Sequence, residues 1–253
     1  MLVDTHCHIF SEYFEDIDKV IERCLCHGVE MIIVNGTNRY DNEEVLKLVR
    51  KYDIVYGALG IQPEEVNDYT EDNLKFIEEH IDDGKILAVG EIGLDYHYEC
   101  DKELQKELFK KQLDIAKKHN KPVIIHSRDC ITETYNILKE TNVKGIMHCY
   151  SGSVEMAKEF VKIGFLLGIG GVSTFKNASK ILDVIKNIPL EYIVLETDAP
   201  YLSPEPYRGK RNEPCNVSVI LKKICEVKGI DYKDASDVTT RNVFRLFDKQ
   251  LKL

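Results

Sequence analysis

The chain has 253 residues and a formal net charge of −9, with 43% hydrophobic and 30% charged residues. This composition is typical of a folded protein, and it excludes a disordered chain and a broadly basic protein that coats nucleic acid. No apolar stretch is long enough to span a bilayer, and the first residues lack the features of a signal peptide. We therefore expect a cytoplasmic protein with no membrane association and with its eight scattered cysteines reduced.

Short apolar, β-branched runs alternate along the chain with segments of helical periodicity. The expected strands cover residues 2–5, 31–34, 54–59, 86–89, 123–125, 145–147, 165–169 and 193–195. The expected helices cover residues 17–26, 43–51, 73–81, 103–119, 131–139, 154–163, 181–188, 217–228 and 235–247. Eight alternating strands at this length favour a closed barrel over an open doubly wound sheet, and no glycine-rich nucleotide motif follows the first strand. We expect residues 1–253 to form one α/β domain, a (β/α)8 barrel of the TIM type.

Histidines and acids follow several of the expected strands. His6 and His8 stand two apart at the end of the first strand, so their side chains point to the same face. The ends of the later strands add Glu91, His126, His148 and Asp198. Because the carboxyl ends of barrel strands meet at the rim that carries active sites, we predict that these six residues form one metal site. The other four histidines fall on expected helices or loops.

Mixed imidazole and carboxylate donors suit Zn, Mn, Fe or Ni, and also Mg where carboxylates dominate. Six donors are too many for one tetrahedral ion, so we expect two divalent ions (Mg, Mn or Zn) bridged by Glu91. One ion would take His6, His8, Glu91 and Asp198, and the other Glu91, His126 and His148. We expect a metal-activated water to attack carbon or phosphorus, with Asp198 as the general base and Glu91 as its catalytic partner.

Residues near this rim predict an anionic substrate. A glycine-rich turn at 168–171 leads to Ser173, Thr174 and Lys176, where barrels often bind phosphate. Arg128 follows His126, and Arg208 and Arg211 follow the eighth strand. In so acidic a chain these cations favour a phosphodiester over a neutral amide. The alternatives are that the glycines serve only a tight turn, and that the arginines pair with Glu205, Glu213 or Asp129.

Several segments together resemble the TatD family of metal-dependent deoxyribonucleases, which are related to the amidohydrolases. The matching segments are VDTHCH at 3–8, GEIGLDY at 90–96, PVIIHSR at 122–128, HCYSG at 148–152, ETDAPYL at 196–202 and PYRGKRNEP at 206–214. The resemblance covers nearly the whole chain. It implies a TIM barrel, a divalent-metal site on the six residues already selected, and nuclease activity, often as a 3'-5' exonuclease on single-stranded DNA. It implies no obligate protein partner.

One position departs from the family pattern. Members usually carry a histidine before the proline in the loop after the third strand, and this chain has Gln62 before Pro63. Glutamine cannot donate a proton near neutral pH, so a substrate role for Gln62 would differ from that of the family histidine. Two other functions stay open: hydrolysis of an amide or ester such as aminoacyl-tRNA by the same apparatus, and a non-catalytic barrel that binds no metal.

Overall fold

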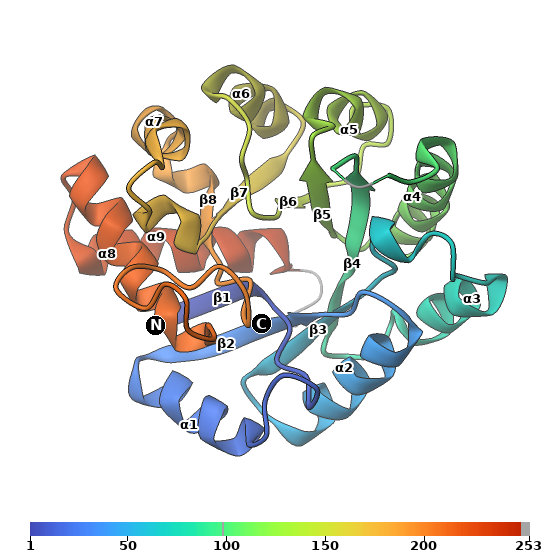
Figure 1. The fold of residues 1–253 in the computed structure, drawn as a ribbon, viewed down its shortest axis with the longest axis horizontal. Helices are drawn as coiled ribbons and strands as arrows, with labels where there is room; N and C mark the ends of the chain where they lie inside the picture. Colours follow the sequence, from blue (N-terminus) through green and yellow to red (C-terminus); the bar gives the residue numbers. More distant parts are fainter. Residues whose placement is uncertain (98, 249–253) are drawn as a thin grey trace.

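The computed structural model describes residues 1–97 and 99–248, and within them eight parallel strands follow one another in order around a barrel (Figure 1). The strands are β1 (Leu2–Cys7), β2 (Val29–Asn35), β3 (Val55–Leu59), β4 (Ile86–Asp95), β5 (Val123–Arg128), β6 (Gly145–Met147), β7 (Phe165–Ile169) and β8 (Ile193–Leu195). The expected (β/α)8 barrel is confirmed. The fourth strand is longer than expected, so Glu91 lies inside β4 rather than after it, and β5 continues past His126.

Helices between the strands form the outer ring in Figure 1. The α-helices are α1 (Ile17–Cys26), α2 (Arg39–Lys51), α3 (Glu71–His80), α4 (Lys102–Lys118), α5 (Ile131–Leu138), α6 (Val154–Lys162), α7 (Ser179–Asn187), α8 (Val217–Lys228) and α9 (Tyr232–Leu246). Short 3-10 turns are η1 (Pro63–Glu65), η2 (Gly171–Thr174), η3 (Leu190–Tyr192) and η4 (Pro214–Asn216). Polar caps fix several starts; the Ser153 side chain, for example, accepts from the Met156 N–H at the start of α6.

The barrel closes where the first strand meets the segment that follows the last one. The Asp198 N–H donates to the His6 carbonyl (2.9 Å), and the His8 N–H donates to the Ala199 carbonyl (2.6 Å). At the opposite end of the barrel, the Ser236 hydroxyl of α9 donates to the carbonyl of Met1 (2.7 Å). At the rim where the metal site was predicted, the first strand and the segment after the last strand therefore meet along a seam.

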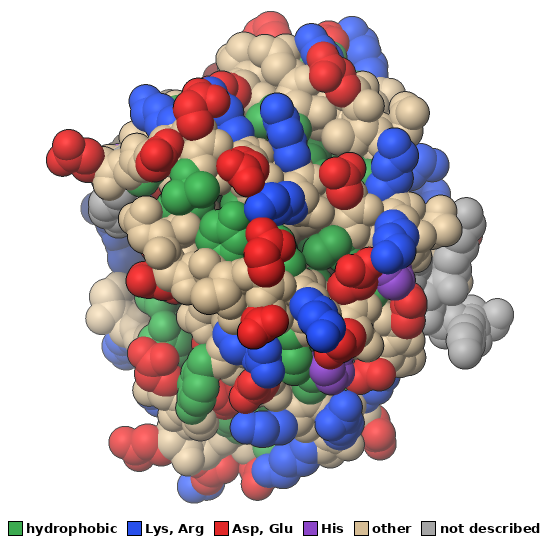
Figure 2. Space-filling view, turned by 90° about the vertical axis from the view of Figure 1, so that its right-hand side faces the viewer, with side chains coloured by type: hydrophobic (Ala, Val, Ile, Leu, Met, Phe, Trp, Pro, Cys, Tyr) green, Lys and Arg blue, Asp and Glu red, His purple; other side chains and the backbone are tan. Residues whose placement is uncertain are grey.

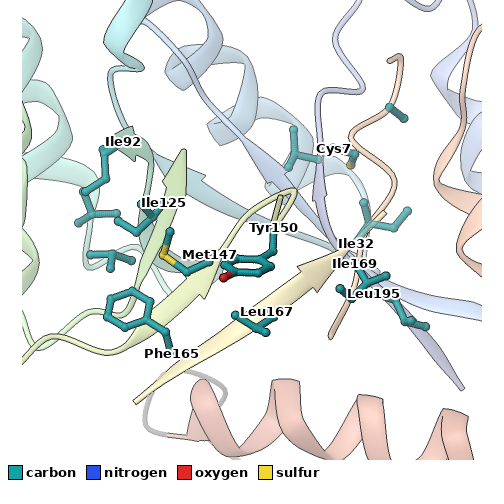
Figure 3. Packing of buried hydrophobic residues seen from close by; sticks show 14 of the residues in the cluster. Cys7, Ile32, Ile92, Ile125, Met147, Tyr150, Phe165, Leu167, Ile169 and Leu195 are labelled. Atoms are coloured by element: carbon teal, nitrogen blue, oxygen red, sulfur yellow. The ribbon is translucent and has the colours of Figure 1, made fainter. Parts of the chain in front are cut away.

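Two apolar layers hold the barrel. Side chains such as Val3, Ile33, Ile124 and Val194 form an interior cluster, to which α9 contributes Val243. A larger cluster fills the space between the strands and the helices, and part of it is drawn in Figure 3. Because side chains alternate between the two layers along each strand, the same alternation decides which residues reach the inside of the rim.

The outer surface carries mixed charge. On the side shown in Figure 2, acidic and basic side chains are interspersed; Lys111 of α4, for example, pairs with Glu71 of α3 at 2.8 Å. None of the helices in the described part of the chain has the length and apolar character needed to cross a bilayer. All eight cysteines lie in the described residues and are free thiols, as expected.

Candidate metal centre

Strand alternation carries the donors to the inside of the rim. In the interior layer, Ile124 of β5 is followed two residues later by His126, and Ile146 of β6 by His148. Val194 of β8 is followed at the same spacing by Glu196 and then Asp198. Period-two alternation thus sends His126, His148 and Glu196 towards the barrel axis, above the apolar interior. Asp198 joins them from the loop after β8, where its φ is 57°.

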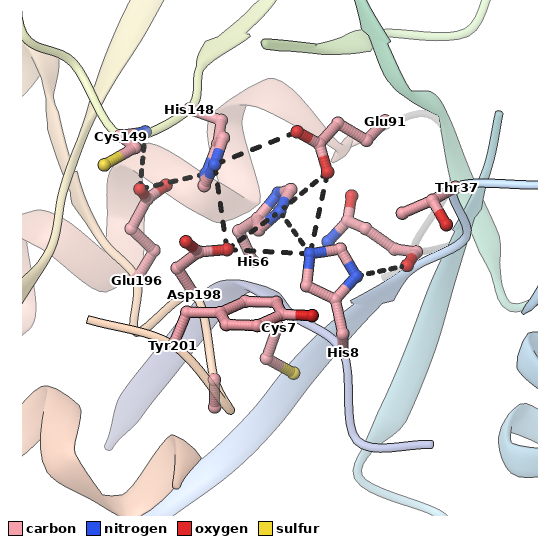
Figure 4. Close-up of polar contacts among 12 residues, drawn as sticks. His6, Cys7, His8, Thr37, Glu91, His148, Cys149, Glu196, Asp198 and Tyr201 are labelled. Atoms are coloured by element: carbon pink, nitrogen blue, oxygen red, sulfur yellow. Dashed lines mark hydrogen bonds and ion pairs between the residues drawn. The ribbon is translucent and has the colours of Figure 1, made fainter. Parts of the chain in front are cut away.

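Four of the predicted donors meet closely (Figure 4). The Nε2 atoms of His6 and His8 are 3.1 Å apart. Glu91 Oε2 lies 3.3 Å from His6 Nε2 and 3.6 Å from His8 Nε2. Asp198 Oδ1 lies 3.7 Å and 3.5 Å from the same two nitrogens. His6, His8 and Glu91 are buried, and the Asp198 side chain is 15% exposed.

These spacings fit a bound divalent ion. Donor atoms about 2.1 Å from a tetrahedral ion stand about 3.4 Å from one another, and the five measured separations run from 3.1 to 3.7 Å. The donor set of two imidazoles and two carboxylates is chemically suited to Zn or Mn, and these four residues would hold that ion.

The other two histidines reach this group through the second oxygen of Glu91. His126 Nδ1 lies 2.8 Å from Glu91 Oε1, and His148 Nε2 lies 3.9 Å from the same oxygen. His148 Nε2 is also 3.8 Å from Asp198 Oδ1. The structure therefore brings all six predicted donors together, with Glu91 in the middle and one oxygen turned to each side.

Neighbouring acceptors orient two of the rings. The Asn35 carbonyl lies 2.8 Å from His8 Nδ1, and Glu196 Oε1 lies 3.1 Å from His148 Nδ1. The hydrogen bond at His8 Nδ1 and the Glu196 charge beside His148 Nδ1 leave the Nε2 atoms, which face the centre, free to bind metal. Glu196 is fully buried, and its Oε1 also accepts the Cys149 N–H at 2.5 Å.

The fourth ring, His126, has a carboxylate on each side. Its Nε2 lies 2.9 Å from Asp95 Oδ2, opposite the contact between Nδ1 and Glu91. Asp95 is itself nearly fully buried, and its other oxygen accepts the His97 N–H at 2.8 Å. His126 is therefore held in place by two acids.

The close packing of acids and imidazoles shifts their pKa values. Burial opposes ionisation of Glu91, but His6 and His126 outweigh it and bring the Glu91 pKa well below its usual range. Burial likewise opposes protonation of the two rim histidines, but acids raise the pKa of His126 to about 10 and that of His148 to about 9. Burial and the nearby His148 lower the pKa of His6. The cluster favours ionised carboxylates, the form that binds metal.

Asp4 joins both sides of the seam behind the donors. Its carboxylate accepts the His6 N–H (3.2 Å), the Thr197 N–H (2.9 Å) and the Thr197 hydroxyl (2.5 Å). Asp4 is fully buried. It therefore fixes the backbone beside two metal donors, His6 and Asp198, that lie far apart in the sequence.

The glycine-rich turn has a packing role. A Cβ atom on Gly168 would overlap the Glu196 carboxylate, and one on Gly171 would overlap the Leu202 carbonyl. Ser173 is fully buried and its hydroxyl donates to the Gly170 carbonyl at 2.7 Å; its contact with substrate stays a prediction. The Thr174 hydroxyl donates to the Gly171 carbonyl and accepts the Glu205 N–H, and its contact with substrate also stays a prediction.

The basic segment after β8 crosses the rim. Arg208 stacks over the Phe175 ring at 4.4 Å, beside the exposed Lys176 in the loop after β7. Arg211 stacks over Phe14 at 4.7 Å and donates to the Tyr13 carbonyl in the loop after β1. The segment thus bridges two loops that lie on either side of the Asp198 segment.

Two of the three acids proposed as alternative partners for the arginines have other contacts. Arg23 binds Glu213 at 2.6 Å, and His97 lies 3.1 Å from Asp129. The charge of Arg128, which is exposed at the end of β5, acts on Asp95 and helps to lower its pKa against burial, after His126. Arg128 therefore lies on the metal side of the rim.

Gln62 is half-buried at the start of η1. Its backbone N–H donates to the Thr37 carbonyl at 2.8 Å, and its side chain hydrogen-bonds Glu65. Its predicted contact with substrate stays a prediction.

Sequence reasoning missed three acids that shape the site: Asp4, Asp95 and Glu196. One of them carried a readable signal, because Glu196 stands two residues before Asp198. Asp4 did not, because Val3 faces the interior layer and the register of β1 shifts between Asp4 and Cys7. Asp95 stands four residues beyond Glu91, and only the unexpected length of β4 brings it beside His126.

Known proteins match this chain along nearly its whole length. The family model described as TatD related DNase matches residues 3–248. The uncharacterized metal-dependent hydrolase YabD of Bacillus subtilis is 43% identical over 98% of this chain and 99% of its own length.

Two solved structures are similar to it as well. The TatD homologue YjjV from Escherichia coli superimposes with a TM-score of 0.92 at 32% identity, covering 98% of both chains. A TatD family hydrolase from Entamoeba histolytica superimposes with a TM-score of 0.85 at 25% identity, covering 97% of both. With the family model, the curated relatives and the fold in agreement, the chain belongs to the TatD-related DNase family and is a metal-dependent hydrolase.

Proposed function

We propose that this hydrolase is a deoxyribonuclease that removes nucleotides from single-stranded DNA, in the manner of a 3'-5' exonuclease, with two divalent ions (Mg, Mn or Zn). The observation that carries the proposal is the basic segment with Arg208 and Arg211, which lies beside the donor cluster on a chain of net charge −9. A local group of cations on an acidic protein favours an anionic substrate. The family description, TatD related DNase, supports the same substrate class.

The residues of the site would bind the metal ions and transfer the proton of the attacking water. His6, His8, Glu91 and Asp198 would hold one ion, and Glu91, His126 and His148 the other. Bound there, the ions would supply an activated water and offset the charge that develops on the phosphate. Asp198 is the most exposed of the four close donors and is placed to take the proton from the attacking water. The Glu91 carboxylate faces both groups and fixes their spacing.

The cations around the rim would position the scissile strand. Arg128 lies on the β5 side, and Lys176, Arg208 and Arg211 lie on the side of the loops after β7 and β8. The guanidinium carbons of Arg208 and Arg211 lie over the Phe175 and Phe14 rings, and the N–H groups that Arg211 does not use on the Tyr13 carbonyl would bind phosphate oxygens, together with those of Arg208.

The decisive experiment resupplies metal-depleted protein with Mg, Mn or Zn and measures hydrolysis of single-stranded DNA, RNA and a simple carboxylic ester. We expect DNA hydrolysis, and we expect the Arg208→Ala/Arg211→Ala variant to raise KM for DNA about 10-fold or more while retaining metal. Lys222→Ala/Lys223→Ala on α8 removes the same charge away from the rim and serves as the control.

Two results would contradict the proposal. Hydrolysis of the ester alone, with no cleavage of nucleic acid under any metal, would assign the site to acyl chemistry. Unchanged DNA kinetics in the double arginine variant would show that the basic segment does not bind the substrate.

A further inference from the structure

An exposed aromatic ring stands beside the metal centre and has no role in the chemistry described so far. Tyr201 lies three residues after Asp198, and its side chain is 49% exposed. Its ring centroid is 6.4 Å from that of His8 (Figure 4). Large apolar groups left exposed next to a catalytic site mark places where a ligand packs.

Neighbouring residues contact both the ring and the backbone of Tyr201. Its hydroxyl donates to the Tyr13 hydroxyl at 3.0 Å, and the two rings meet edge to face at 5.9 Å. The buried Asn212 side chain donates to the carbonyls of Thr197 (2.8 Å) and Tyr201 (2.7 Å), which ties this loop to the basic segment. A ring fixed in this way loses little entropy when a ligand stacks on it.

A cation completes the arrangement. Arg211 precedes Asn212 and donates to the carbonyl of Tyr13, the residue whose hydroxyl receives the Tyr201 contact. A flat aromatic surface, a guanidinium and the metal centre therefore lie side by side. A nucleotide carries groups that suit these features: a planar base for the aromatic ring, and phosphates for the guanidinium and the metal centre.

We propose that Tyr201, supported by Tyr13 and flanked by Arg211, is a stacking subsite for the base of the nucleotide next to the scissile phosphate. This inference rests on the proposed nuclease function and adds to it a reason for single-strand preference. A base can stack on Tyr201 only after it has left a duplex, so unpaired ends bind and paired ends do not. Stacking tolerates every base, so the subsite confers little sequence preference.

The chain offers a direct probe because it contains no tryptophan. Tyr201→Trp places one indole in the subsite, and Tyr232→Trp places one at the opposite end of the barrel, where Tyr232 is 37% exposed at the start of α9. The ligands are short oligothymidylates with phosphorothioate linkages, which slow hydrolysis, and the same backbone with abasic sugars. We expect oligothymidylate to quench the fluorescence of Tyr201→Trp, the abasic strand to quench it far less, and neither to affect Tyr232→Trp.

Affinity measurements separate stacking from general damage. We expect Tyr201→Ala to weaken oligothymidylate binding about 5- to 100-fold while leaving the abasic strand nearly unaffected. Tyr201→Phe keeps the ring and should bind within about 2-fold of the natural protein. Metal content is measured for every variant, because Tyr201 shares a loop with Asp198.

The outcomes distinguish the two proposals. If the natural protein cleaves single-stranded DNA but Tyr201→Ala binds it equally well, or base and abasic strands quench Tyr201→Trp alike, the stacking subsite is wrong and the nuclease stands. If the natural protein neither binds nor cleaves nucleic acid with any metal, the nuclease proposal is wrong, and so is the stacking subsite that rests on it.

Discussion

Replacement of Glu196 by glutamine tests whether a buried acid that touches no substrate controls the metal centre. The variant keeps the shape of the side chain and the oxygen that accepts the Cys149 N–H, so it removes little except negative charge. That charge lies 3.1 Å from His148 Nδ1 and is the first of the effects that raise the His148 pKa to about 9 against burial. Without it, the His148 ring becomes a poorer donor and a less firmly oriented one.

The expected loss of metal affinity follows from the contact between Glu196 and the ring of His148. Loss of a partner that orients a metal-binding histidine lowers metal affinity about 10- to 100-fold, or about 1.4 to 2.8 kcal/mol. We expect a loss in this range for Glu196→Gln by competition with a chromogenic chelator. In the metal-free protein, histidine resonances measured by NMR should show a lower His148 pKa than in the natural chain.

A matched control distinguishes this effect from a general loss of charge. Glu78→Gln removes an acid that pairs with Lys118 on the surface and should leave metal affinity unchanged. If Glu196→Gln binds metal as tightly as Glu78→Gln, the orientation of His148 does not depend on Glu196.

Three further predictions concern the frame around the donors. Gly168→Ala forces a methyl group against the Glu196 carboxylate and should cost about 1–3 kcal/mol of unfolding free energy, measured by urea denaturation; wild-type stability would contradict the packing role. Asp4→Asn places an amide N–H group where three donors now bind the Asp4 carboxylate, so we expect it to lower the free energy of unfolding by about 1–3 kcal/mol in the same assay. Asp237→Asn on α9 is the surface control, and equal stability of the two variants would contradict this prediction. Metal affinity should rise as pH increases from 6 to 8, because metal must displace protons from His126 and His148, whose raised pKa values of about 10 and 9 keep them charged in that range. Calorimetry in buffers of different ionisation enthalpy measures this proton release. If no protons are released, these two histidines do not bind the metal.

Sequence periodicity was sufficient for the barrel because each strand and helix carries its own pattern. The helices at 17–26 and 217–228 begin and end where the apolar spacing places them. The six predicted donors lie together because parallel strands deliver their carboxyl ends to one rim. Glu91 was misplaced by the length of β4, since Ile92 and Leu94 continue a buried strand that the glycines at 90 and 93 interrupt in the sequence.

Contacts between distant segments could not be read from the chain. The glycines at 168 and 171 suggest an anion-binding turn, but their neighbours are the Glu196 side chain and the Leu202 carbonyl, which belong to the next loop. Ser173 illustrates the same limit, because its hydroxyl is buried by the fold and turns back to the Gly170 carbonyl. Local patterns identify which residues can do chemistry, and tertiary packing decides which of them are available.

The position of the seam also governs when the site can exist. His6 and His8 are made with β1, whereas their backbone partners Asp198 and Ala199 follow only after β8 has been made. A nascent chain on the ribosome therefore holds two histidines long before it holds the acid that completes their group. Metal capture by the full donor set must wait until β8 and the segment after it reach β1, so a loaded centre reports that the first and last strands of the barrel have met.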